Sequence, residues 1–404
     1  MGAGTFCNTK FSCGVSGASC ADTPATKSDK SATNQLRRVR RTFMEAYTLP
    51  VDVSCAPDLW GKVRNEVRES QYSAQVSAAD LQNERLTEQA SLAEYFFEIR
   101  GQDALIQLYA NTIQADQQTF KMTQGLYETG VDDQISVVQA QNTLLAAEAA
   151  ATNLGILRAQ YEHAIAVLVG KPASEFSIPV KAMTTAPPPI PIGVPSQLLQ
   201  RRPDIAAAER TMAAANAEIG VADAAYYPSL TLAASAGTET SVLTKLLSWP
   251  SRFWSIGPSL SETIYDGGLR RATVNQYIAT YNADLASYRQ TVLAAFQQVE
   301  DELAAVRILS KQIEQQTRVV ASDQTALQLE LGRYQTGVDP YLDVVSLQAT
   351  LLSDQQTLAS LKVEQMTGAV ELVEALGGGW DSSQLPTPEQ VSQKLTRDES
   401  TIQH

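Results

Sequence analysis

The chain has 404 residues, of which 31 are Lys or Arg and 44 are Asp or Glu, so its formal net charge is −13. This acidic balance argues against a nucleic-acid-binding protein, which needs a basic surface. Hydrophobic residues make up 44% of the chain, which argues against wholesale disorder, and no run of 18 apolar residues is present to form a membrane-spanning helix. A membrane strand would escape that test, because its polar and apolar residues alternate.

Side chains suited to catalysis or metal binding are scarce. The two histidines are His163 and His404, and of the four cysteines only Cys55 lies outside the first twenty residues. Their spacings fit no zinc-binding pattern. The adjacent Glu162 and His163 are more typical of a helix surface than of a general base. We therefore predict that the protein is not an enzyme and that it binds no metal and no cofactor.

The first 45 residues are atypical. They lack the apolar stretch of about 7–15 residues that a secretory signal needs. The segment 37–41 carries four positive charges in five residues, which would make a poor membrane segment. We interpret residues 1–45 as a segment without a signal peptide that is not the genuine amino end, because of a wrong start, a frameshift or a truncated gene.

Three later segments, residues 47–54, 226–237 and 254–261, place an apolar side chain at every second position, with small or polar residues between. This alternation is typical of transmembrane β-barrel strands, although a soluble hairpin with one buried face shows it too. The very long helices that follow directly favour the barrel. The polar face, which we expect to line a water-filled lumen, contains Thr231, Ser235, Ser255, Ser259 and Ser261.

Two very long helices follow from the distribution of prolines and from heptad repeats. Prolines are absent between positions 57 and 172 and, apart from Pro340, between positions 258 and 386. Within both stretches apolar residues recur every seven positions, which is typical of a supercoiled helical seam. The first helix, from Lys62 to Leu126, would extend roughly 100 Å. A plain antiparallel coiled coil is the alternative on this evidence.

The two halves of the chain are copies of each other. Residues 127–145 align without gaps with residues 334–352, and 11 of these 19 positions are identical. Each long helix ends at Thr-Gly-Val, where Gly favours a left-handed turn, and a return helix follows over 134–169 or 341–372. A proline cluster at 172–195 joins the copies, and a further helix is expected over 196–225. We predict an incomplete first repeat, a second repeat and a polar C-terminal tail, at residues 46–185, 186–382 and 383–404.

Carboxylates gather at the two predicted tips, where Asp132 and Asp133 follow the first turn and Asp339 and Asp343 follow the second. In an assembly of several chains such carboxylates could form rings that hold a pore mouth shut or bind cations. The alternatives are solvated turn carboxylates and helix N-caps, and the positions of Asp132 and Asp339 favour capping.

The order of strand, long helix, Thr-Gly-Val tip and return helix, duplicated across a proline-rich linker, resembles the TolC family of outer membrane factors. The stretch from Pro195 to Ile205, together with Tyr227–Leu230, Arg333–Val338 and Ala375–Trp380, is similar to the NodT-type lipoprotein branch, which serves resistance-nodulation-division pumps. The resemblance covers about residues 46–382.

The resemblance implies a mainly α fold with a small membrane β-barrel part, built from a duplicated strand and helical-hairpin repeat. In such a homotrimer four strands per chain close a twelve-stranded barrel in the bacterial outer membrane, and the helices form an α-barrel in the periplasm. The implied function is a passive exit duct for small molecules in a tripartite efflux system, driven by an inner-membrane resistance-nodulation-division pump through a periplasmic adaptor (a membrane fusion protein). The expected adaptor contacts are Thr129, Gly130, Val131, Thr336, Gly337 and Val338, and the expected periplasmic gate is Asp132, Asp133, Asp339 and Asp343.

The chain departs from the family pattern in three ways. The export signal and lipid-attachment cysteine of the lipoprotein branch are missing, only three strands are recognisable, and Ser346 stands where relatives carry Asp. Residues 20–30 are the alternative, degenerate fourth strand. Because an open barrel edge in lipid is very costly, the alternative function is a truncated, non-exported coiled-coil remnant without transport activity.

Overall fold

The computed structural model describes residues 5–11, 14–15, 47–181, 187 and 200–391. The segments 20–30 and 37–41 named above lie outside these ranges, as do part of the proline-rich linker and the end of the C-terminal tail. The chain forms two compact units, one from residues 1–71 and 213–283 and one from residues 72–212 and 284–404. Each unit therefore contains residues from both halves of the chain. The division into two units does not follow the boundary between the predicted repeats.

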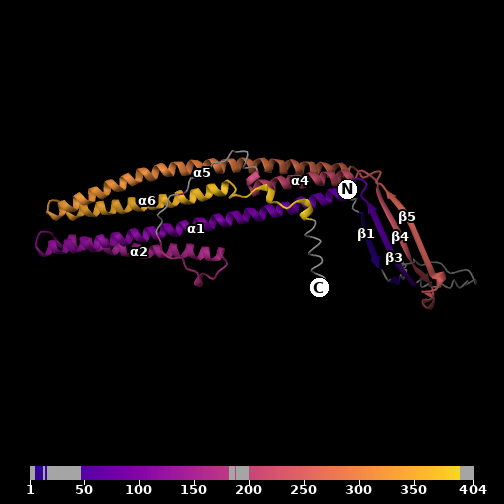
Figure 1. Cartoon of the computed structure of the whole chain (residues 1–404), viewed down its shortest axis with the longest axis horizontal. Coiled ribbons are helices and arrows are strands. Elements are labelled where there is room, and N and C mark those ends of the chain that lie inside the picture. The colour runs from indigo at the N-terminus through magenta and orange to yellow at the C-terminus, as the bar shows by residue number, and fades with distance from the viewer. Residues whose placement is uncertain (1–4, 12–13, 16–46, 182–186, 188–199, 392–404) are drawn as a thin grey trace, which may run out of the picture. The chain divides into compact units, whose positions relative to one another are not determined.

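The first unit is built on an antiparallel sheet (Figure 1). Strands β1 (Thr5–Phe11), β3 (Tyr47–Pro57), β4 (Ser229–Thr240) and β5 (Arg252–Ser261) pair in that order, and the short β2 (Gly14–Val15) also pairs with β3. The three strands expected from alternation are confirmed.

The prediction that only three strands remain is wrong, because β1 adds a fourth to the edge of β3. The alternative at residues 20–30 is not this strand. The register places Lys10 opposite Asp52 and Asn8 opposite Ser54. Sequence reasoning missed β1 because the number of residues between β1 and its counterpart in the second repeat differs from the constant spacing between the other repeated elements. Seven residues are also too few for a distinctive pattern.

An aspartate precedes each long helix and binds its first turn. Asp58 accepts hydrogen bonds from the backbone N–H of Val63 and Arg64 at the start of α1 (Lys62–Glu128). Asp266 accepts from the backbone N–H of Gly268 and Arg270 at the start of α5 (Leu269–Gln335). In both copies the arginine side chain also donates to the same carboxylate. These bonds satisfy orphan donors of the helix and fix the direction in which each helix leaves its strand.

The remaining helices are α2 (Gln134–Leu168), α4 (Pro203–Ala224) and α6 (Tyr341–Ala375), with short 3₁₀ turns over Ala173–Glu175, Leu243–Lys245, Trp249–Ser251 and Ser382–Gln384. In the second unit, α1 with α2 and α5 with α6 form two antiparallel hairpins, as predicted (Figure 1). No helix in the described part of the chain combines the length and apolar character needed to cross a lipid bilayer.

The largest apolar cluster near the tips joins the two hairpins. Ala140 of α2, Tyr334 of α5 and Tyr341 and Val344 of α6 are buried together. The rings of Tyr334 and Tyr341 lie 5.4 Å apart, centroid to centroid, at an angle of 51°. The heptad positions of the long helices therefore bury only part of their surface within one chain.

A buried ion cluster holds the chain that follows α2 against the first hairpin. The Asp103 carboxylate, whose side chain is fully buried, accepts from Arg158 Nε at 2.8 Å, from Arg100 Nη1 at 3.1 Å and from the backbone N–H of Lys181 at 2.9 Å. Arg158 Nη2 also donates to the carbonyl oxygen of Ile178 at 2.6 Å. The backbone N–H and C=O groups of this irregular segment have no partners in a helix or sheet. The charged side chains bind these backbone groups instead.

The Asp103→Asn substitution should loosen this segment, because it removes the carboxylate that lies between two largely buried guanidinium groups and leaves Arg158 with Glu162 alone. We expect the free energy of local opening around residues 176–181 to fall by about 3–5 kcal/mol. Amide hydrogen exchange of peptides covering α1, α2 and residues 172–181 measures it. The control is Glu314→Gln, which removes an exposed ion pair with Arg318 and should change opening by less than about 0.5 kcal/mol. Unchanged protection in Asp103→Asn would contradict the assignment.

Candidate functional site

Both hairpin tips reverse direction through the same turn. Gly130 has φ +73° and Gly337 has φ +70°, in the left-handed region that favours glycine. In the first tip the N–H of Gly130 donates to Tyr127 and that of Val131 to Leu126. In the second, the N–H of Gly337 donates to Tyr334 and that of Val338 to Arg333. This pair of bonds is the Schellman motif, so the turn follows from the Thr-Gly-Val sequence itself.

The turn leaves one apolar side chain exposed at each tip. Val131 is 60% exposed and Val338 is 64% exposed. The threonine that precedes each glycine is exposed too, and its hydroxyl donates back to carbonyls of its own helix. The six predicted contact residues therefore form two similar exposed patches, each made of a small loop with a valine at its apex.

Among the predicted gate carboxylates, only Asp132 links the two hairpins. Its Oδ2 accepts a hydrogen bond from the hydroxyl of Tyr334, which is 3% exposed, and its Oδ1 accepts from Ser136 Oγ at 2.8 Å. The Tyr334 hydroxyl also lies 3.1 Å from Thr123 Oγ1. Burial opposes the charge on Asp132, but the hydrogen bonds from Tyr334, the Asp133 N–H and Ser136 prevail and lower the pKa of its carboxyl. Burial and the bond to Asp132 raise the pKa of Tyr334, so the tyrosine stays a donor.

The other three carboxylates act within their own hairpins or face solvent. Asp133 is the N-cap of α2 and accepts from the Ser136 N–H at 3.0 Å, so capping falls one residue later than the predicted Asp132. Asp339 does not cap α6, which starts behind Pro340, but binds both Nε and Nη2 of Arg333. That guanidinium lowers the pKa of the Asp339 carboxyl. Asp343 lies exposed in the first turn of α6.

The predicted lumen residues share one face of the sheet. Thr231 is opposite Ser259, Ser235 is opposite Ser255 with their hydroxyl oxygens 2.8 Å apart, and Ser261 is opposite Ser229. On β3, Asp52 continues this row opposite Ser235. The opposite face of β5 presents large apolar side chains that are mostly exposed in the single chain, namely Trp254, Ile256 and Leu260. The strand pairing thus sorts polar and apolar residues onto two faces.

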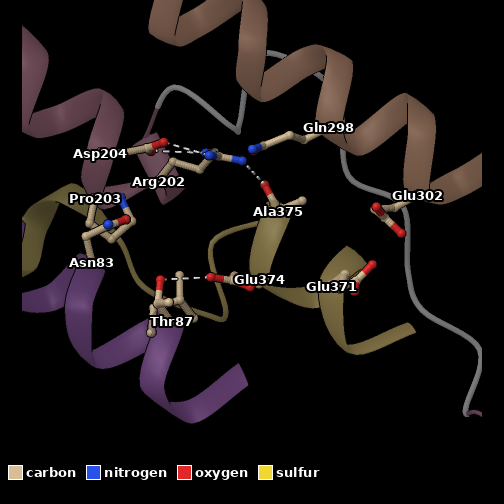
Figure 2. A pocket seen from close by; sticks show the side chains of 11 residues that line it. Asn83, Thr87, Arg202, Pro203, Asp204, Gln298, Glu302, Glu371, Glu374 and Ala375 are labelled. Atoms are coloured by element: carbon tan, nitrogen blue, oxygen red, sulfur yellow. Dashed lines mark hydrogen bonds and ion pairs between the residues drawn. The ribbon is translucent and has the colours of Figure 1, made fainter. Parts of the chain in front are cut away.

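The arginine of the Arg-Arg-Pro-Asp motif closes the end of α6 (Figure 2). Arg202 binds Asp204 through Nε at 3.0 Å and Nη2 at 2.6 Å, and its Nη1 donates to the carbonyl oxygen of Ala375 at 2.9 Å. An added Cβ at Gly377, where φ is +91°, would lie 2.0 Å from the carbonyl oxygen of Arg201. The Arg-Arg-Pro-Asp motif and the Ala375–Trp380 motif, which lie at opposite ends of the second repeat, therefore contact each other. These contacts explain the arginine at position 202 and the glycine at position 377.

The same region holds a small cavity of about 360 Å³ with several carboxylates on its wall. Figure 2 shows the side chains of Glu302 of α5 and Glu371 of α6 close to each other at one side of this region. Burial, and then the neighbouring Glu371 charge, raise the pKa of Glu302 to about 7. Within the described residues no group of three or more His, Cys, Asp or Glu is arranged to hold a metal ion. The hydrogen bonds on its wall join α6 to α1, through Thr87 and Glu374, and to the start of α4, through Arg202 and the carbonyl oxygen of Ala375.

Sequence reasoning missed the residues that bind the tip carboxylates. The heptad repeat of the second long helix includes Tyr334 at one of its apolar positions, and it gives no role to the tyrosine hydroxyl. Arg333 was recognised only as part of a motif. The one signal that could have found Tyr334 is its place three residues before Gly337, where a polar aromatic in a buried heptad position needs a hydrogen-bond partner.

The chain matches the family described as "Outer membrane efflux protein" over residues 25–171 and 194–378. The probable efflux pump outer membrane protein TtgC of Pseudomonas putida is 31% identical over 325 residues, which are 80% of this chain and 67% of that protein. The solvent efflux pump outer membrane protein SrpC of Pseudomonas putida is 32% identical over 331 residues, which are 81% of this chain and 70% of that protein.

Solved structures with the same fold are outer membrane proteins. The outer-membrane channel OprN has a TM-score of 0.81 at 27% identity, and the match covers 94% of this chain and 82% of that one. The outer membrane protein VceC of Vibrio cholerae has a TM-score of 0.80 at 25% identity, covering 94% and 88%. Motifs, fold and relatives agree that this chain belongs to the outer membrane efflux protein family.

Proposed function

We propose that this chain is the outer membrane channel subunit of a tripartite efflux system and serves as a passive exit duct. The observation that carries the proposal is the joining of two duplicated helical hairpins to a sheet with one polar and one apolar face, in a member of this family. Relatives are named for efflux of toluene, solvents and antibiotics and for pyoverdine export, and we infer a small-molecule cargo here too. No observation favours the alternative of a remnant without transport activity.

The working form is a homotrimer. Among the described strands of one chain, β1 and β5 are the edge strands of the sheet, and open edges do not persist in lipid. Three copies of the four-stranded path β1-β3-β4-β5 would close a twelve-stranded barrel whose polar face lines the lumen. The acidic character of the chain would favour cations in such a pore. The helices then extend into the periplasm, where an adaptor links the channel to an inner-membrane resistance-nodulation-division pump.

The two faces of β5 should respond in opposite ways to the same charge. Ile256→Lys places an ammonium group on the apolar face and should cost about 2–4 kcal/mol of membrane stability, so little trimer should reach the outer membrane. Ser259→Lys places it on the polar face and should assemble normally while reducing any cation preference. Trimer in the outer membrane fraction, followed by reversal potentials in planar bilayers, measures both. Equal loss of assembly in the two variants would count against the assigned faces.

The exposed valines at the tips are the proposed adaptor contact. Replacing both Val131 and Val338 by Asp should abolish adaptor binding and reduce efflux at least tenfold, because two apolar anchors are removed without disturbing the turns. Binding of the purified adaptor to detergent-solubilised trimer measures the effect. The matched control is Val169→Asp at the opposite end of the first hairpin, which is also exposed. Normal adaptor binding by the double variant would exclude these tips as the contact.

The hydrogen bond between Tyr334 and Asp132 is the proposed lock of the periplasmic gate. Tyr334→Phe keeps the ring in its apolar cluster but removes the donor, at a cost of about 1.5–3 kcal/mol for a bond to a charged group. We expect the open fraction of the channel to rise about 10- to 100-fold, seen as a larger basal conductance in planar bilayers. The exposed Tyr127 provides the control Tyr127→Phe. A basal conductance equal to that of the parent protein would show that the gate is held elsewhere.

A further inference from the structure

A second polar contact crosses from the first hairpin to the second, farther from the tips. Asp116 of α1 is 4% exposed, and its Oδ1 accepts a hydrogen bond from Gln348 Nε2 of α6 at 3.3 Å. The other carboxylate oxygen, Oδ2, is buried without a partner, and so is Gln348 Oε1. Two buried acceptors thus lie on one contact without a donor for either, which is unusual in a folded protein.

A proton would resolve this deficit. A neutral carboxylic acid offers one donor and one acceptor, and a primary amide offers the same. With a proton on Oδ2, Asp116 could donate to Gln348 Oε1 while still accepting from Nε2, so that the pair becomes a ring of two hydrogen bonds. Without the proton, a buried negative charge faces one weak donor, which is costly.

The surroundings of Asp116 supply no positive charge. Among the described residues no Lys or Arg forms an ion pair with it, and Lys121 on the same helix is exposed. The titratable group that the Asp116 charge affects is Tyr341 on α6, which is neutral near pH 7; burial, and then that charge, raise the pKa of Tyr341 to about 12. Tyr334 on α5, whose ring packs against Tyr341, is neutral near pH 7 too.

The facing helices add no cation either. On α2 the charged Glu148 is exposed, and on α6 Asp354 is bound by Gln316. Burial alone raises the pKa of the Asp116 carboxyl from 3.8 to about 6.

We propose that Asp116 and Gln348 form a proton-binding site that strengthens the seam between the two hairpins when it is occupied and weakens the seam when it is empty. The site joins the same two hairpins as the Tyr334–Asp132 bond but uses different residues. It therefore adds a pH response that the Tyr334–Asp132 bond does not provide. It does not depend on transport, because it concerns contacts within a single chain.

The direction of the response follows from linkage. The pKa of Asp116 is higher with the seam closed than its ordinary value of 3.8, so the closed state binds more protons between the two values. The seam is therefore most stable at acidic pH and loses stability as the pH rises through about 6. With these two pKa values, the equilibrium constant for opening should rise about tenfold between about pH 5 and about pH 7.5.

Hydrogen exchange of the full-length protein in detergent tests the proposal. After correction for intrinsic exchange rates, peptides covering α1 around Asp116 and α6 around Gln348 should open about tenfold more often at about pH 7.5 than at about pH 5. Asp116→Asn should remove this pH response and hold the seam closed, because its amide can pair with Gln348 as the neutral acid would. Asp80→Asn, at an exposed aspartate on the same helix, should keep the full response.

The outcomes separate cleanly. A flat pH profile in the parent protein, or a profile that persists in Asp116→Asn, would overturn the proposal. If Asp116→Asn fails to assemble, Asp116→Ala serves the same purpose, because any folded variant without the carboxyl must lose the response. Efflux activity is not part of the readout, so loss of transport for another reason leaves the result interpretable.

Discussion

A helix of 67 residues cannot bury its own apolar side chains, and this constraint governs the whole architecture. In the single chain, α5 has only four buried residues, Ala295, Val299, Val320 and Tyr334. Its heptad seam and many exposed apolar side chains, such as Leu293, Ile308 and Leu329, need cover that one chain does not supply. The strand edges at β1 and β5 need closing in the same way. Both requirements support the proposed association with further copies of the chain.

Within the chain, polar bonds supplement the apolar cluster that joins the two hairpins near their tips. Besides the tip contact, Gln356 Nε2 donates to the hydroxyl of Tyr109 at 2.8 Å, and Gln348 reaches Asp116. A polar seam fixes one register, because a displaced hairpin would leave its donors and acceptors unpaired. It also separates at a lower cost than an apolar core, because the freed groups can bind water. Such a seam suits the gate proposed above, which needs a defined closed state that can still open.

The long-range plan of the fold was predictable from the sequence because the duplication is gapless. The bounds of α1 and α2 reappear in α5 and α6 with the same spacing, and the Thr-Gly-Val turns fold as their local chemistry requires. The prediction failed where the partner of a residue lies on another element. Strand β1 depends on pairing with β3, and the roles of Tyr334 and Gln348 depend on which hairpin packs beside them. Periodicity reports which side of a helix is buried, but not what it meets there.

The equal lengths of the two hairpins have a further consequence. Helices α1 and α5 both have 67 residues, α2 and α6 both have 35, and the two tips share one backbone turn. Their side chains differ, because one tip has its carboxylate tied to a tyrosine and the other to an arginine. In a ring of three such chains, a partner that contacts the backbone of the turns would meet six equivalent sites. A partner that contacts the charged side chains would meet three sites of each kind. The duplicated tips thus allow a partner to bind in six copies or in three, depending on whether it contacts the backbone of the turns or their charged side chains.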